Sequence, residues 1–159
     1  MIMDKGMDTG DILLVDETPI EQNDDAQSLH DKLSEQGGKL VLETLSRLQK
    51  NDLLPTPQDS DLASYAPKLK KEESLIDWKI DAESIFNKIR GLSPWPGTHT
   101  LYNGKRLAIL KGEIVLGESS DRPGHVERIT DTGIEVGTGK NRLKITELKL
   151  EGKKAMPVK

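Results

Sequence analysis

The chain has 159 residues, of which 34% are hydrophobic and 31% are charged, with a net charge of −4, a composition typical of a globular protein. It has no cysteine, which excludes disulfide bonds, thiolate nucleophiles and cysteine zinc sites, and its three histidines fit no metal-binding spacing, so we expect no metal. No apolar run approaches the roughly 20 residues of a membrane span and no signal-peptide pattern opens the chain, so we expect a cytoplasmic protein without a membrane partner.

The two halves of the chain carry opposite charge. Residues 1–67 hold 5 Lys and Arg against 14 Asp and Glu, a net charge of −9, whereas residues 68–159 hold 18 against 13, a net charge of +5. Clustered basic residues bind polyanions because they release counterions from phosphates. The second half is therefore the candidate for binding a nucleic acid, and ordinary surface charge is the alternative.

An acidic turn, Met7-Asp8-Thr9-Gly10-Asp11, lies close to the start of the chain. A carboxylate on a glycine-supported turn is a candidate acid or base, and Gly10 would allow a ligand to approach the backbone closely. The apolar run at residues 12–15 follows and predicts a short strand, which Pro19 ends.

A helix is predicted from a cap at Asp24 or Asp25 to about Lys50. Its apolar face consists of Leu29, Leu33, Leu40, Val41, Leu45 and Leu48. Gly37-Gly38 costs about 1 kcal/mol per glycine relative to alanine, so we expect a break or a close backbone contact there. Because one strand and one helix cannot close a core, residues 1–53 look like the edge of an α/β domain. Disorder, dimerisation and crystal pairing are all open outcomes for the exposed apolar face.

A proline-punctuated polar stretch at residues 54–73 predicts a linker, which ends in the basic residues Lys68, Lys70 and Lys71. Asp81 is then expected to cap a short helix at residues 82–90, with Ile85 and Ile89 among its apolar positions.

Short β-prone runs separated by turns make up the rest of the chain, at residues 98–102, 106–116, 125–130, 133–136 and 142–150. Asn103-Gly104 is a strong hairpin signal, and residues 117–121 form another expected turn. Five short strands predict a small closed barrel of the OB type. Trp78 and Trp95 are the only tryptophans. Proline on both sides of Trp95 holds its indole at a fixed angle, which would suit ligand stacking, but we expect Trp95 to plug the core between the short helix and this barrel.

Together these segments resemble the methionyl-tRNA formyltransferases. The resemblance rests on residues 3–13, 28–33, 55–59, 65–68, 76–78, 94–97 and 151–156, which follow the family's order along nearly the whole chain. It implies an α+β fragment. Residues 1–53 would be the last strand and helix of a Rossmann-like α/β catalytic domain, 54–73 the linker, and 74–159 an OB-like β-barrel domain with a short helix that binds tRNA. The end of the chain stops short of the family's usual finish, so we expect a final strand or helix to be absent.

The resemblance also implies an activity. Family members transfer a formyl group from 10-formyltetrahydrofolate to the α-amino group of initiator methionyl-tRNA. Asp8 would be the catalytic aspartate, which orients a histidine, while that histidine and an asparagine stabilise the oxyanion. Both partners lie upstream of Asp8 in the family, so we expect no formyl transfer by these residues alone. Asp8, Thr9 and Gly10 would lie at the folate site.

The implied partner is initiator methionyl-tRNA, and the complete enzyme is expected to be a monomer. The candidate tRNA contacts are Lys68, Lys70, Lys71, Lys140, Arg142, Lys153 and Lys154. Two alternatives stay open: a sugar-nucleotide formyltransferase of the same architecture, and a free-standing OB-like binding module without catalysis. An upstream His-x-Ser-Leu-Leu-Pro segment, with an asparagine two residues before the histidine, would favour an enzyme. A genuine initiator at Met1 would favour the module.

Overall fold

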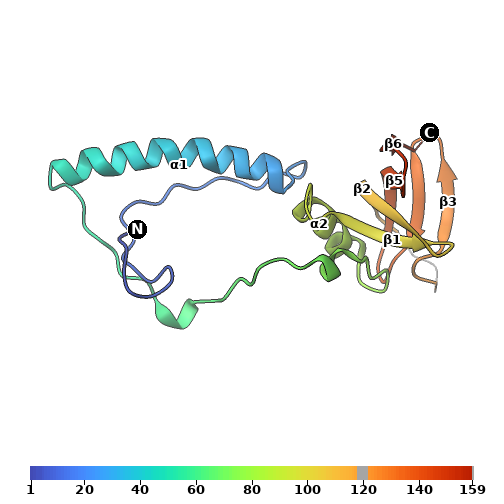
Figure 1. The fold of residues 1–159 in the computed structure, drawn as a ribbon, viewed down its shortest axis with the longest axis horizontal. Coiled ribbons are helices and arrows are strands. Elements are labelled where there is room, and N and C mark those ends of the chain that lie inside the picture. Colours follow the sequence, from blue (N-terminus) through green and yellow to red (C-terminus); the bar gives the residue numbers. More distant parts are fainter. Residues whose placement is uncertain (118–121, 159) are drawn as a thin grey trace. The chain divides into compact units, whose positions relative to one another are not determined.

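The computed structural model describes residues 1–117 and 122–158 (Figure 1). The chain divides into two compact units. We call residues 1–24 and 28–68 the N-terminal unit, and residues 25–27 and 69–159 the C-terminal unit. The expected turn at residues 117–121 falls mostly outside the described residues.

A long helix, α1 (Ala26–Gln49), dominates the N-terminal unit, which also holds the short 3-10 helix η1 (Ser60–Leu62). The Asp24 carboxylate stabilises the start of α1, because it accepts hydrogen bonds from Ser28 Oγ at 2.9 Å and from Lys32 Nζ at 2.7 Å. The helix runs unbroken through Gly37-Gly38 (Figure 1), and a Cβ at either glycine would meet nothing within 4 Å. The predicted helix is confirmed, whereas the predicted break or close contact at these glycines is wrong.

The predicted strand at residues 12–15 does not form. Ile12 makes a single antiparallel bridge to Thr56, with N–O distances of 2.8 and 2.9 Å, and the following residues pair with no described strand. Extended backbone becomes a strand only where a neighbour accepts its hydrogen bonds, and the described chain supplies none beyond Thr56. The run is apolar enough for a strand but lacks the partner that would make it one.

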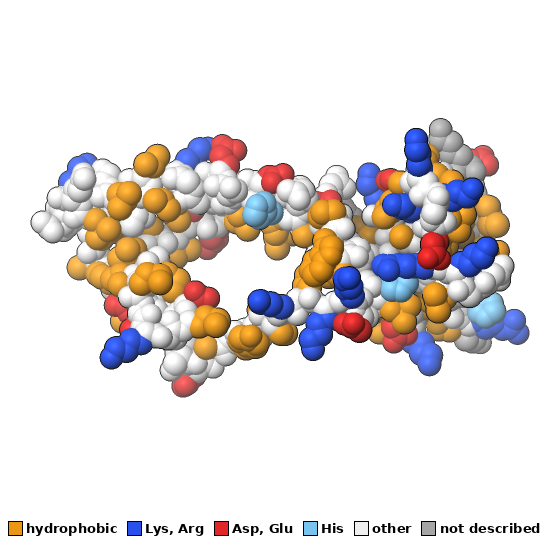
Figure 2. Space-filling model, in the orientation of Figure 1, with side chains coloured by type: hydrophobic (Ala, Val, Ile, Leu, Met, Phe, Trp, Pro, Cys, Tyr) orange, Lys and Arg blue, Asp and Glu red, His pale blue; other side chains and the backbone are white. Residues whose placement is uncertain are grey.

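The N-terminal unit has no buried hydrophobic core. α1 has no buried residue, and every buried hydrophobic side chain of the described residues lies between Ile76 and Leu148. Figure 2 shows hydrophobic side chains exposed over α1 and the segments beside it. The expectation that one helix and its neighbouring segment cannot close a core therefore holds.

The C-terminal unit is an antiparallel sheet with one α-helix. Its elements are η2 (Lys71–Ser74), α2 (Ala82–Gly91), β1 (Thr98–Tyr102), β2 (Lys105–Val115), β3 (Val126–Thr130), β4 (Gly133–Gly137), β5 (Arg142–Leu150) and β6 (Met156–Pro157). The short helix and the five predicted strands are confirmed within about one residue at each end, and β6 was not predicted.

The strands run in the order β1-β2-β5-β4-β3, with β6 paired to β5. Among the described residues no ladder joins β3 to β1, so the strands form an open sheet rather than the closed barrel that the sequence predicted. An irregularity near Gly112 bends β2, where an added Cβ would lie 3.1 Å from the Lys144 carbonyl oxygen. The bend lets β2 pair with β1 at its start and with β5 along most of its length.

The core lies between α2 and the sheet. Ile85 and Ile89 of α2 are 0% and 4% exposed and pack with buried residues of β2, β4 and β5. Trp78 packs against this core and donates a hydrogen bond from Nε1 to Thr100 Oγ1 at 3.0 Å. Trp95 is 60% exposed and lies in a turn in which the Gly97 amide donates to the Leu92 carbonyl at 2.9 Å. Its predicted core position is wrong.

Candidate functional site

The acidic turn is clamped by a residue far along the chain. The side-chain amide of Gln58 donates to the Asp8 carbonyl at 2.8 Å and to the Gly10 carbonyl at 2.7 Å. Asp8 itself has φ +55°, a left-handed conformation that costs energy for a non-glycine residue. The Gln58 clamp and the Ile12–Thr56 bridge hold this conformation in place.

Gly10 is required by the protein's own backbone. A Cβ at this position would lie 1.8 Å from the Ile2 carbonyl oxygen, and the Ile2 amide donates to the Asp11 carbonyl at 2.9 Å. The close approach that the sequence predicted at Gly10 is therefore made by residue 2. The structure shows no free space at Gly10 for a ligand to take the same place.

A hollow of about 800 Å³ surrounds the turn. It is lined by Met7, Asp8, Thr9, Ile12, Gln58, Asp59, Ser60, Leu62, Ala63, Ser64, Tyr65 and Ala66. Asp8 and Thr9 lie in this wall, but Gly10 does not. The wall offers carboxylates from Asp8 and Asp59, and no histidine or asparagine is among these described residues. Such a site can orient a cation or a protonated group, but it has no side-chain pair that would stabilise an oxyanion.

The linker lysines are exposed, and the turn that carries two of them is hydrogen-bonded to the sheet. Lys68, Lys70 and Lys71 all have exposed side chains. Ser74, only 2% exposed, donates from Oγ to the Lys71 carbonyl at 2.6 Å and contacts His99 Nδ1 at 3.0 Å. Lys70 and Lys71 therefore project from a fixed support on β1, as a phosphate-binding surface requires.

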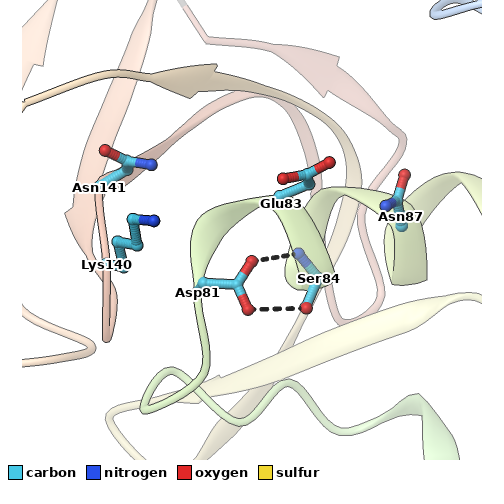
Figure 3. A pocket seen from close by; sticks show the side chains of 6 residues that line it. All are labelled: Asp81, Glu83, Ser84, Asn87, Lys140 and Asn141. Atoms are coloured by element: carbon cyan, nitrogen blue, oxygen red, sulfur yellow. Dashed lines mark hydrogen bonds between the residues drawn. The ribbon is translucent and has the colours of Figure 1, made fainter.

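Lys140 lies beside carboxylates. Figure 3 shows it at a cavity of about 530 Å³ together with Asp81, Glu83, Ser84, Asn87 and Asn141. Asp81 caps α2, accepting from Ser84 N at 2.8 Å and from Ser84 Oγ at 2.7 Å, and these bonds lower the pKa of its carboxyl group. Because Asp81 and Glu83 share the cavity with Lys140, the local charge is less positive than the sequence suggested.

Arg142 is partly enclosed by two carboxylates. Its side chain is 26% exposed, and Nη1 lies 3.7 Å from Glu135 Oε2 and 3.9 Å from Glu127 Oε2. Lys153 and Lys154 are exposed and lie in the turn that follows β5. Arg142 is the first residue of this nine-residue strand, so at the usual rise per residue it lies roughly 27 Å from the end of the strand that precedes the two lysines. The structure thus brings Lys70 and Lys71 together but does not gather all seven candidate residues into one patch.

Sequence reasoning missed two residues that organise these surfaces. Gln58 clamps the Asp8 turn, and His99 ties the lysine turn to β1. Both act across long sequence separations, so no local periodicity identifies them. Among the described residues, no cluster of three or more His, Asp or Glu side chains is placed to hold a metal, and no helix is long and apolar enough to span a bilayer.

Comparison with known proteins places this geometry in a family. Residues 68–159 match the model of the formyl transferase C-terminal domain. Over 157 residues, 99% of this chain and 49% of the relative, the sequence is 46% identical to a methionyl-tRNA formyltransferase of Citrifermentans bemidjiense. It is also 46% identical over 159 residues to the enzyme of that name from Caldanaerobacter subterraneus subsp. tengcongensis, covering 100% of this chain and 51% of that protein. The chain therefore spans about half the length of the curated relatives it matches.

Solved structures share the fold at lower identity. HypX from Aquifex aeolicus in complex with tetrahydrofolic acid matches 98% of this chain and 28% of its own, with a TM-score of 0.67 and 23% identity. An N-formyltransferase from Helicobacter canadensis, in complex with folinic acid and dTDP-3-aminofucose, matches 90% of this chain and 52% of its own, with a TM-score of 0.67 and 20% identity. Because residues 68–159 match the C-terminal domain of the formyl transferases, the chain belongs to the formyl transferase family.

Proposed function

We propose that this chain is the C-terminal part of a methionyl-tRNA formyltransferase, and that its own task is to bind the backbone of the initiator tRNA. The names of the relatives at 46% identity support the enzyme. In this proposal its formyl donor is 10-formyltetrahydrofolate, and a structural neighbour in complex with tetrahydrofolic acid supports a folate donor. The observation that carries the tRNA role is the exposed lysine turn, held on β1 by Ser74 and His99. A turn whose backbone is held in place binds phosphates at a smaller entropic cost than an unattached segment.

The two units have separate roles in this proposal. Residues 1–53 form the end of the catalytic domain, residues 54–73 the linker, and residues 74–159 an OB-like domain that binds tRNA and whose described strands form an open sheet. The absence of a buried core in the N-terminal unit supports the first assignment, because such a unit needs apolar surface from elsewhere to cover α1. The complete enzyme is a monomer in this proposal.

Asp8 is the catalytic aspartate in this proposal, with Asp8 and Thr9 at the folate site and Gly10 as a support of the turn, because its close contact is with Ile2. The Gln58 clamp supports this assignment, because it holds the backbone that carries the Asp8 carboxylate. The hollow around Asp8 supplies neither the histidine nor the asparagine of the family mechanism. We therefore expect these 159 residues alone to transfer no formyl group to methionyl-tRNA in a mass-based assay with 10-formyltetrahydrofolate. Turnover above that of a buffer control would contradict this expectation.

The proposed tRNA surface consists first of Lys68, Lys70 and Lys71. Lys153 and Lys154, exposed in the turn after β5, form a separate part of it, and Lys140 contributes less because Asp81 and Glu83 face the same cavity. Arg142 contributes little to tRNA binding in this proposal. Its guanidinium lies near the carboxylates of Glu127 and Glu135, so its main role is to support the sheet.

Labelled tRNA and a matched pair of variants test this surface. We expect K70Q/K71Q to weaken binding to the full chain roughly 10-fold at low salt, because two phosphate contacts are lost. The control K39Q/K50Q removes the same charge from Lys39 of α1 and from Lys50, just after the helix, neither of which belongs to the proposed tRNA surface, and it is expected to bind as the unmodified chain does. Equal affinity of both variants would refute the lysine turn as the contact. If the unmodified chain does not bind tRNA at low salt, the sugar-nucleotide alternative becomes the better interpretation.

A further inference from the structure

A histidine on β1 joins the linker turn to the sheet. His99 Nδ1 lies 3.0 Å from Ser74 Oγ, and its carbonyl oxygen accepts from the Ile76 amide at 2.9 Å. Ser74 already uses its only hydroxyl hydrogen to donate to the Lys71 carbonyl at 2.6 Å. Ser74 Oγ therefore accepts from His99, so the neutral ring carries its hydrogen on Nδ1, and Nε2 is the atom that takes up a further proton.

Two cations lie near this ring. In the β1–β2 ladder His99 is opposite Ala108 and Leu101 is opposite Arg106, so His99 and Arg106 share one face of the sheet as diagonal neighbours. From α2, Lys88 donates from Nζ to the Leu75 carbonyl at 2.8 Å, next to Ser74. Three nitrogen groups from β1, β2 and α2 thus converge beside the turn that bears the linker lysines.

The charges of this cluster are not neutralised within the described chain. Neither Arg106 nor Lys88 forms an ion pair with a carboxylate there. Burial lowers the pKa of His99, the charges of Arg106 and Lys88 lower it further, and a hydrogen bond with Ser74 opposes the shift. The carboxylates of η2, Glu72 and Glu73, are exposed, and Glu73 accepts from the Lys70 amide at 3.2 Å. Mutually repelling cations without a counter-ion are typical of an anion site.

We propose that His99, Arg106 and Lys88 form a second phosphate site for the RNA backbone, continuous with the linker lysines. One phosphate oxygen accepts from the Arg106 guanidinium and another from Nε2–H of protonated His99, while Lys88 keeps its bond to Leu75 and adds its charge. The inference rests on the proposed function, since it names a further part of the same tRNA surface.

Proton uptake gives this site a signature that the linker lysines lack. A bound phosphate stabilises the protonated ring, so the pKa of His99 is higher in the complex than in the free chain. At pH values below the pKa of His99 in the free chain, and at pH values above its pKa in the complex, the affinity for tRNA does not change with pH. Between these two pKa values the affinity falls as pH rises, by at most about 10-fold per pH unit for one proton. Lysine contacts, which stay protonated throughout this range, give no such dependence.

Three variants of the full chain test the site with labelled tRNA. We expect R106Q to lower the slope of log affinity against log salt by about one unit, the loss of one phosphate contact. K105Q is the matched control, because the neighbouring residue loses the same charge on the opposite face of β2. H99N keeps an amide donor for Ser74 Oγ but cannot titrate, so the ratio of affinities between about pH 5.5 and about pH 7.5 should fall towards one.

NMR titration of the His99 ring adds a readout that a purely structural role would not change. We expect its pKa to rise when tRNA or inorganic phosphate is added, and to rise less in R106Q. The site is overturned if K70Q/K71Q weakens tRNA binding while R106Q matches K105Q and H99N keeps the pH dependence of the unmodified chain. If the unmodified chain binds no tRNA at low salt, the proposed function fails together with this site.

Discussion

Replacing Arg142 tests whether its guanidinium supports the sheet or contacts RNA. Arg142→Met keeps much of the side-chain volume but leaves Glu127 and Glu135 facing each other without their shared cation. Removing one partner of a buried ion pair costs about 3–5 kcal/mol. Arg142 is 26% exposed and its two contacts are long, at 3.7 and 3.9 Å, so the cost lies below that range. We expect a loss of about 2–3 kcal/mol in the free energy of unfolding of the C-terminal unit.

The expected loss of unfolding free energy corresponds to a lower melting temperature. A segment the length of residues 69–159 has an unfolding entropy of roughly 0.19 kcal/mol/K, so the midpoint should fall by about 10–15 °C in a circular dichroism melt. Lys149→Met, the same charge change at an exposed position of β5, should shift the midpoint by no more than about 2 °C. Glu135→Leu combined with Arg142→Met should recover part of the loss. An unchanged midpoint for Arg142→Met, with tRNA affinity reduced as in K70Q/K71Q, would refute the supporting role.

Three further changes have expected outcomes. Leu143→Ala, at a fully buried position of β5, should cost about 3 kcal/mol in the same melt, whereas Leu150→Ala, 36% exposed in the native chain, should cost much less. In Gly10→Ala the added Cβ should push the backbone of Ile2 away from residue 10, so the Ile2 amide should exchange its hydrogen faster. Unchanged exchange would argue against the close contact between Gly10 and Ile2. Asp24 has its pKa lowered from 3.8 to about 2, chiefly by a hydrogen bond from Lys32, so its stabilisation of α1 is complete above about pH 4 and is lost as pH falls through about 2. The signal at 222 nm should therefore lose helicity over that range, and less steeply in Asp24→Asn.

Local signals predicted the C-terminal unit well. Asn103-Gly104 with alternating residues on either side fixed the β1–β2 hairpin, and Asp81 fixed the start of α2, because a turn type and a helix cap depend on neighbouring residues only. Closure of the barrel depends on a pairing between strands distant in the sequence. No local pattern reports such a pairing, and the described strands form an open sheet.

The N-terminal unit shows where local reasoning fails. Residues 12–15 have the composition of a strand, but a strand also needs a partner, and Thr56 alone supplies one bridge. The candidate site has the same limit. Asp8 is a candidate because of its turn, whereas Gln58, 50 residues away, and the grouping of His99 with Arg106 follow from the fold and the strand register.

The proposed function is tested most directly by the affinity of the full chain for initiator methionyl-tRNA, measured as a function of salt concentration. We predict that log affinity falls linearly with log salt, and that K68Q/K70Q/K71Q reduces the slope by about two to three units, because each lysine lost removes one phosphate contact. No binding at low salt, or an affinity that does not change with salt, would contradict the assignment of this unit to the tRNA backbone.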